Sequence, residues 1–69
     1  MRGWMKSKRE NLGLTQQNVA DKLGVSKQYY QLIEKGERQS DLCVSLIMGL
    51  ATCFNMSAVD IVNLENETD

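Results

Sequence analysis

The stretch QQNVADKLGVSKQYYQLIEK, residues 16–35, decides the fold of this 69-residue chain. Its apolar residues recur at helical spacing on both sides of a break at residues 23–26, which predicts two short amphipathic helices joined by a tight turn. Gly24 provides the backbone freedom that such a turn needs, and Ala20 is small where the two helices would cross. The stretch therefore predicts a closely packed helix pair.

The second helix of this pair carries amide and ammonium groups on its outer face. With Lys27 as the origin and about 100° per residue, Gln31 falls at about 40° and Gln28 at about 100°. Tyr30 falls at about 300°, on the opposite side, and is expected in the core. Glutamine pairs with adenine and lysine donates to guanine, so we expect Lys27, Gln28 and Gln31 to read bases in the major groove of DNA. A merely solvated helix face is the alternative.

Caps and breaks along the chain predict five helices. Their expected bounds are about residues 4–11, 16–23, 27–35, 41–54 and 57–64. Thr15 and Ser26 are the expected N-caps of the central pair, and Gly36 is the expected stop after it. Residues 1–64 would form one all-α domain, and residues 65–69, which lack apolar side chains, a disordered acidic tail.

The chain resembles the helix-turn-helix domains of the phage-repressor and Cro type, the XRE family. The resemblance is carried by Arg9-Glu10, Gly13-Leu14-Thr15-Gln16, Val19-Ala20, Leu23-Gly24-Val25-Ser26 and Ile33-Glu34-Lys35-Gly36. It implies a five-helix, lambda-repressor-like DNA-binding fold. It also implies a transcriptional regulator, most simply a repressor, that binds an inverted-repeat operator in double-stranded DNA as a homodimer.

The resemblance further implies roles for single residues. Arg9 would form a structural salt bridge with Glu34, and Gln16 would contact the DNA backbone and support the reader at Lys27. Free N–H groups at the start of residues 16–23 favour a phosphate in any case. The full set of expected backbone contacts is Gln16, Gln17, Ser26, Tyr29, Lys35 and Arg38.

Charge is unevenly distributed along the chain. The formal net charge is −1, but all eight Lys and Arg residues fall within residues 1–38, together with four acidic residues, which gives this part a charge of +4. Residues 39–69 hold five acidic residues and no basic one. A basic half that carries the helix pair, backed by an acidic half, suits a protein that touches phosphates with one face.

The apolar residues of segment 41–54 cover most of a helix circumference. Such a helix is either central in the fold or pressed against a second molecule, and a chain of this size encloses it poorly. We therefore expect a homodimer. Its expected contact residues are Leu46, Leu50, Val59, Ile61, Val62 and Leu64. Two alternatives stay open: all of this surface is core, or it engages a different protein, as in an antitoxin-like module with secondary DNA binding.

Several other classes of protein are not expected. Cys43 and Cys53 are expected as buried thiols in a reducing cytoplasm, because ten residues of one helix would separate them by about 15 Å, too far for a bridge. Without histidine they make no zinc site, so no metal and no cofactor are expected. No long apolar run suggests a membrane span, and no small-molecule ligand is evident. The absence of histidine, of a Gly-rich phosphate loop and of clustered carboxylates argues against an enzyme.

Overall fold

The computed structural model describes residues 2–39 and 41–67 of the chain. Within these ranges it contains helices and no strand. The helices are α1 (Gly3–Asn11), α2 (Gln16–Leu23), α3 (Lys27–Lys35), α4 (Val44–Phe54) and α5 (Ala58–Glu67). The predicted all-α, five-helix architecture is confirmed, and α2 and α3 have the predicted bounds.

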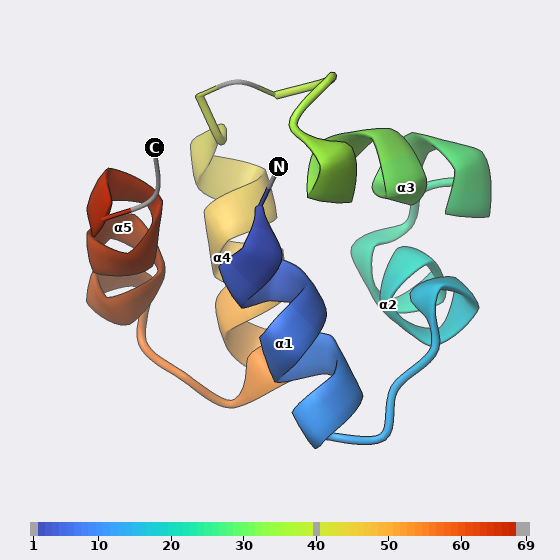
Figure 1. The fold of residues 1–69 in the computed structure, drawn as a ribbon, viewed down its shortest axis with the longest axis horizontal. Coiled ribbons are helices and arrows are strands. Elements are labelled where there is room, and N and C mark those ends of the chain that lie inside the picture. Colours follow the sequence, from blue (N-terminus) through green and yellow to red (C-terminus); the bar gives the residue numbers. More distant parts are fainter. Residues whose placement is uncertain (1, 40, 68–69) are drawn as a thin grey trace.

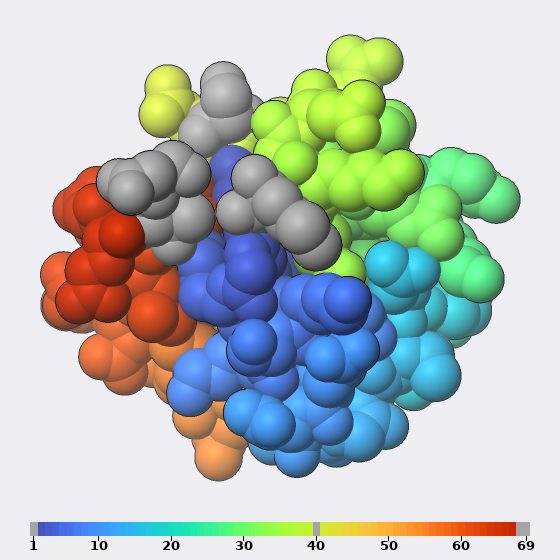
Figure 2. Space-filling model, viewed as in Figure 1, coloured from blue at the N-terminus to red at the C-terminus, as the bar shows by residue number. Residues whose placement is uncertain are grey.

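The helices form a body with extents of 25 × 24 × 21 Å. The helix α2 packs against both α3 and α4, α4 also packs against α5, and α1 packs against α3. In Figure 1, α1 and α4 lie in the middle, with α5 on one side and α2 and α3 on the other. Figure 2 shows that α1 fills the centre of this face. The helices α3 and α5 are therefore at opposite sides of the molecule.

Local hydrogen bonds fix the start of each helix in the α2–turn–α3 unit. The Thr15 hydroxyl accepts from the backbone N–H of Asn18 at 3.1 Å, and the Asn18 side chain accepts from the Thr15 N–H at 3.0 Å, so α2 begins with a full capping box. Ser26 caps α3 by accepting from the N–H of Tyr29 at 3.1 Å. Gly24, between the helices, has φ 74°, a left-handed conformation that favours glycine. The unit is thus a rigid pair.

Each helix contributes at least one fully buried side chain to a common core. The largest of these are Met5, Val19, Tyr30, Ile33, Leu50 and Ile61. The helix α3 supplies two of them, Tyr30 and Ile33. These two side chains anchor its inner side in the core, so its outer side faces away from the molecule. The core placement of Tyr30 is confirmed.

The helix α4 begins later than predicted. Cys43 is its N-cap, with extended backbone angles of φ −74° and ψ 161°, so the expected start near residue 41 is wrong. The cap position leaves the Cys43 thiol exposed and 3.3 Å from the Ser45 hydroxyl, and it is not the buried thiol that we expected.

Within the described ranges, no single helix is long and apolar enough to cross a membrane; α4 and α5 meet that test only as a pair bent by 105°.

The helix α5 extends further than predicted. It runs to Glu67, so the expected disordered tail is wrong for residues 65–67, and residues 68–69 lie outside the described ranges. Glu65 explains the difference, because its carboxylate accepts from Arg2 Nε at 2.8 Å and from Trp4 Nε1 at 2.9 Å. A polar segment can be ordered by charged partners as well as by apolar burial.

Three of the six expected dimer contacts lie in the core of the single chain. Leu46 is 8% exposed, and Leu50 and Ile61 are fully buried, so none of them is available to a second copy. The reason is that α4 is covered by α2 on one side and by α5 on another. Val59 and Val62 on α5 are 67% and 41% exposed, and these two remain candidates for a contact with another molecule. Leu64 is half-buried.

Tyr30 gives a first testable prediction, because its buried hydroxyl has no hydrogen-bond partner among the described residues. Burial raises the pKa of Tyr30 and the nearby Glu34 carboxylate raises it further, although the two groups do not reach hydrogen-bonding geometry. Tyr30→Phe removes a desolvated polar group, so we expect the free energy of unfolding in urea to rise by about 1 kcal/mol. A fall of that size would show that the hydroxyl is paired in solution. Tyr29→Phe is the matched control, because it removes a hydroxyl that does have a partner: the Tyr29 hydroxyl accepts from Gln39 Nε2 at 2.8 Å.

Candidate nucleic-acid interface

The outer face of α3 presents the residues that the sequence placed there. Lys27, Gln28 and Lys35 are exposed, whereas Tyr30 and Ile33 on the opposite side are fully buried. No hydrogen bond or ion pair within residues 2–39 and 41–67 involves the side chain of Lys27 or Gln28. Both side chains are therefore available to a ligand, and their contact with bases stays a prediction.

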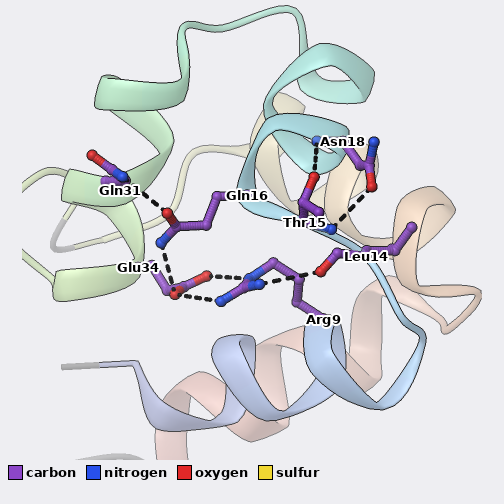
Figure 3. A network of polar contacts seen from close by, with 7 residues as sticks. All are labelled: Arg9, Leu14, Thr15, Gln16, Asn18, Gln31 and Glu34. Carbon is purple, nitrogen blue, oxygen red and sulfur yellow. Dashed lines mark hydrogen bonds and ion pairs between the residues drawn. The ribbon is translucent and has the colours of Figure 1, made fainter.

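Gln31 is placed differently from the other two expected readers. It is half-buried, and its Nε2 donates to Gln16 Oε1 at 2.9 Å. Figure 3 shows its amide oxygen directed away from Gln16, so the acceptor and one N–H of the amide remain available. The resemblance implied that Gln16 supports the reader at Lys27. In this structure Gln16 instead holds Gln31, because both side chains meet where the start of α2 faces the middle of α3.

A chain of polar contacts braces α3 from behind. Gln16 Nε2 donates to Glu34 Oε1 at 3.4 Å, and Glu34 accepts from Arg9 Nε at 3.0 Å and from Arg9 Nη2 at 3.3 Å. Arg9 Nη1 also donates to the Leu14 carbonyl at 3.1 Å. Arg9 and Glu34 are the pair that the resemblance implied, and they are 9% and 3% exposed. The brace joins α1, α2 and the last turn of α3 (Figure 3).

Electrostatics within the brace favours the ionised forms. The hydrogen bond to Glu34 raises the pKa of Arg9. Burial acts to raise the pKa of Glu34, but the hydrogen bonds that it accepts, above all from Arg9, outweigh burial and leave this pKa below its ordinary value. The pair is therefore charged at neutral pH, and its two charges compensate one another.

A shallow hollow lies between the start of α2 and the start of α3. It is lined by Arg9, Leu14, Thr15, Gln16, Gln17 and Lys27. A phosphate placed in it would face the free N–H groups of the first turn of α2 and the Lys27 ammonium. Gln17 lies exposed at the edge and donates to Asp21 on its own helix at 2.7 Å. The hollow is thus a suitable place for an anion.

The remaining expected backbone contacts lie at both ends of α3. Ser26 uses its oxygen for the helix cap and keeps its hydroxyl proton for another acceptor. Tyr29 is half-buried and its hydroxyl, which accepts from Gln39, can still donate. Lys35 and Arg38 are exposed at the far end of the helix and in the loop after it. Polar and basic groups thus flank the proposed readers on two sides, as two phosphate strands would require.

Sequence reasoning missed two residues beside this face. Gln39 lies in the loop after α3 and has φ 55°, an unusual value for a residue other than glycine. Arg2 is 5% exposed, and its side chain reaches the carbonyls of Ile33 and of the same loop. Nothing in the sequence marks either residue, because their partners lie far away along the chain.

Comparison with known proteins adds to this geometry. The profile of the helix-turn-helix family matches residues 5–42. The chain is 39% identical over 49 residues to a protein of Bacillus subtilis (strain 168) called the uncharacterized HTH-type transcriptional regulator YqaF. The aligned part covers 71% of this chain and 64% of that protein, slightly less than two thirds of its length. No solved structure matches the chain significantly.

Proposed function

Because the chain belongs to the helix-turn-helix family, in its XRE branch, we propose that it is a transcriptional regulator that binds duplex DNA sequence-specifically. The observation that carries the proposal is the outer face of α3, where Lys27 and Gln28 are exposed and have no partner among the described residues. The same helix is braced from behind by Arg9 and Glu34. The curated relative is named as a regulator of the same type, which supports the same class.

In the proposed complex α3 lies in the major groove. Gln28 and Gln31 offer the donor and acceptor pair that adenine presents, and Lys27 offers a donor to guanine. The hollow at the start of α2 receives a phosphate on one side of the groove, and Lys35 and Arg38 contact the backbone on the other side. The brace behind α3 keeps the base-reading groups in a fixed direction.

We further propose a repressor that binds its operator as a homodimer. A single chain measures 25 Å in its longest direction, which is shorter than the roughly 34 Å of one DNA turn, so one copy reads one half-site. One copy also makes few phosphate contacts, and affinity at cellular salt depends strongly on their number. Two copies would read an inverted repeat and block the access of polymerase.

The experiment that tests this function is selection of random duplexes on the purified protein at about 150 mM salt. The expected result is a two-fold symmetric site with half-sites about 10 base pairs apart from centre to centre. Recovery of no preferred sequence, or of one half-site only, would contradict sequence-specific binding or the dimer, respectively.

The proposed dimer gives a second prediction. Val59→Glu combined with Val62→Glu places charges on the two exposed valines of α5 without touching the core, so the fold should be kept. We expect the dissociation constant of the dimer, measured by sedimentation equilibrium, to rise at least about tenfold. Met48→Glu is the matched control, because Met48 is 57% exposed on another helix. Dissociation by the control alone would move the interface from α5 to α4.

One observation favours a second candidate function, a protein-binding module of the antitoxin type. Val44 and Met48 are 75% and 57% exposed and stand one turn apart on α4, beyond the part of the chain that the family profile matches. Such a pair suits a hydrophobic contact with a non-identical protein. A stoichiometric complex with another protein from the native host, together with no selected DNA sequence, would support this candidate over the regulator.

A further inference from the structure

Arg2 is a buried cation at the meeting point of several segments. It is 5% exposed and immediately precedes α1. Its Nη1 donates to the Ile33 carbonyl at 2.6 Å and to the Arg38 carbonyl at 3.3 Å, and its Nη2 donates to the Gln39 carbonyl. Its backbone N–H donates to the Glu34 carbonyl at 2.9 Å. Arg2 thus contacts the last turn of α3 and the loop after it.

This placement is favourable for α3. The last turn of a helix leaves carbonyl groups without intrahelical partners and carries a partial negative charge. The Arg2 guanidinium supplies donors and a positive charge at that end of α3. Figure 1 shows the start of α1, the loop after α3 and the last turns of α5 at the same end of the molecule.

Glu65 on α5 compensates the Arg2 charge. It accepts from Arg2 Nε at 2.8 Å and from Trp4 Nε1 at 2.9 Å through the same oxygen. The Trp4 ring in turn stands edge-on to Phe54 of α4, with the ring centroids 6.4 Å apart. The Arg2 guanidinium is therefore held in one orientation by a residue of α5, which lies on the side of the molecule opposite α2 (Figure 1).

The loop that Arg2 holds has an uncommon backbone conformation. Gln39 has φ 55°, which costs free energy for a residue with a side chain and persists only when its surroundings enforce it. Two contacts do so: the Gln39 carbonyl accepts from Arg2, and the Gln39 amide donates to the Tyr29 hydroxyl on α3. Arg38, the basic residue of this loop, is attached directly to the enforced position.

We propose that Arg2 is a positioning residue for DNA binding, which fixes the loop so that the Arg38 side chain meets the phosphate backbone beside α3. Glu65 fixes Arg2 in turn. This inference rests on the proposed function, but its structural half does not need DNA. Arg2 itself touches no nucleic acid, because its guanidinium is enclosed by Glu65 and by the carbonyls of α3 and the loop.

The first arm of the test contains no DNA. Arg2→Lys keeps the positive charge but cannot reproduce the planar fork that reaches Glu65 and the loop carbonyls together. Amide NMR spectra of this variant should show shifts at residues 37–39 and unchanged signals at Lys27 and Gln28. Unchanged loop signals would overturn the proposal whether or not the protein binds DNA. If Arg2→Lys does not fold, Glu65→Gln, which keeps an acceptor for Trp4, serves in its place.

The second arm measures affinity for the selected duplex as a function of salt. Arg38→Ala should lower affinity about tenfold and reduce the slope of log K against log salt by about 0.9 per subunit. Arg2→Lys should reproduce both changes although its charge is kept. The double variant should bind no more weakly than Arg38→Ala alone, since both changes remove the same phosphate contact.

A matched control separates positioning from general loss of charge or stability. Lys22→Gln removes a positive charge beside Gly49 and Cys53 of α4, away from the loop, and should leave the salt slope unchanged. A lower melting temperature in Arg2→Lys with an unchanged salt slope, or multiplied losses in the double variant, would reduce Arg2 to a structural residue. Absence of DNA binding in the unaltered protein would instead contradict the proposed function, and the first arm would still decide the role of Arg2 in the loop.

Discussion

Glu34→Gln should lower the free energy of unfolding by about 3 kcal/mol, the largest effect on stability that we expect from a single polar substitution in this chain. The change is nearly isosteric and removes one charge. It leaves the Arg9 guanidinium, which is 9% exposed and 3.0 Å from the Glu34 carboxylate, buried without a counter-charge. Urea denaturation followed by circular dichroism measures the loss.

The same pair should have a pH signature. The folded protein holds the pKa of Glu34 below its ordinary value of 4.5, so the stabilisation is complete above that value and is lost as the pH falls through the lower, folded pKa. The unaltered protein should therefore lose stability below about pH 4.5, and Glu34→Gln should lose less over the same range. If the free energy of unfolding falls with pH in parallel for the two proteins, the ion pair is contradicted.

Two controls test the reason for the loss. Glu37→Gln makes the same chemical change at an exposed position nearby, and its effect should stay within about 0.5 kcal/mol. The double variant Arg9→Met, Glu34→Leu removes both charges and should recover a large part of the stability. If the double variant is less stable than Glu34→Gln alone, the loss of stability in Glu34→Gln arises from lost packing and not from an unpaired buried charge.

The helix pair could be predicted residue by residue because its ends depend on local chemistry. Thr15 and Ser26 cap helices through residues three positions away, and Gly24 and Gly36 adopt the left-handed conformation that ends them. These interactions can be read from neighbouring letters of the sequence. Asn18 was not predicted as the second member of the capping box, because the usual residues at this position are Glu and Gln.

The less successful predictions concern contacts between distant segments. The sequence marks α4 as apolar nearly all round, but it does not say which side α2 and α5 cover, so core residues such as Leu50 and Ile61 were assigned to a dimer interface. The tail was missed for the same reason, since Arg2 and Glu65 are 63 positions apart. Periodicity identifies a buried face only when a helix has one polar side.

At the candidate site, residue types were predictable but their connections were not. The exposed position of Lys27 and Gln28 follows from helical periodicity, given a core at Tyr30 and Ile33. The bond from Gln31 to Gln16 depends on the distance between α2 and α3, which the sequence does not contain. Because of this bond, Gln16→Ala would change a proposed backbone contact and the support of a proposed reader together.

Gln28→Ala should lower affinity for the selected operator by at least about 30-fold and leave affinity for random DNA unchanged. One lost bidentate contact costs roughly 1–3 kcal/mol, and a dimer loses it in both half-sites, which gives about 2–6 kcal/mol. Gln28 is uncharged and exposed, so the variant should keep both the stability and the salt dependence of the unaltered protein. Fluorescence anisotropy with specific and random duplexes measures the ratio.

Substitutions at the backbone contacts supply the contrast. Arg38→Ala should weaken binding to specific and random duplexes alike, because a phosphate contact carries no sequence information. Lys27→Ala should show both effects, since it loses a base donor and a charge. Gln16→Ala should resemble Lys27→Ala, because the Gln16 side chain has two roles. It accepts from Gln31 at 2.9 Å, and it lines the hollow proposed to receive a phosphate. Equal losses on both duplexes for Gln28→Ala would remove it from the readers and leave α3 as a backbone-binding helix, because a neutral exposed amide can discriminate sequences only through base edges.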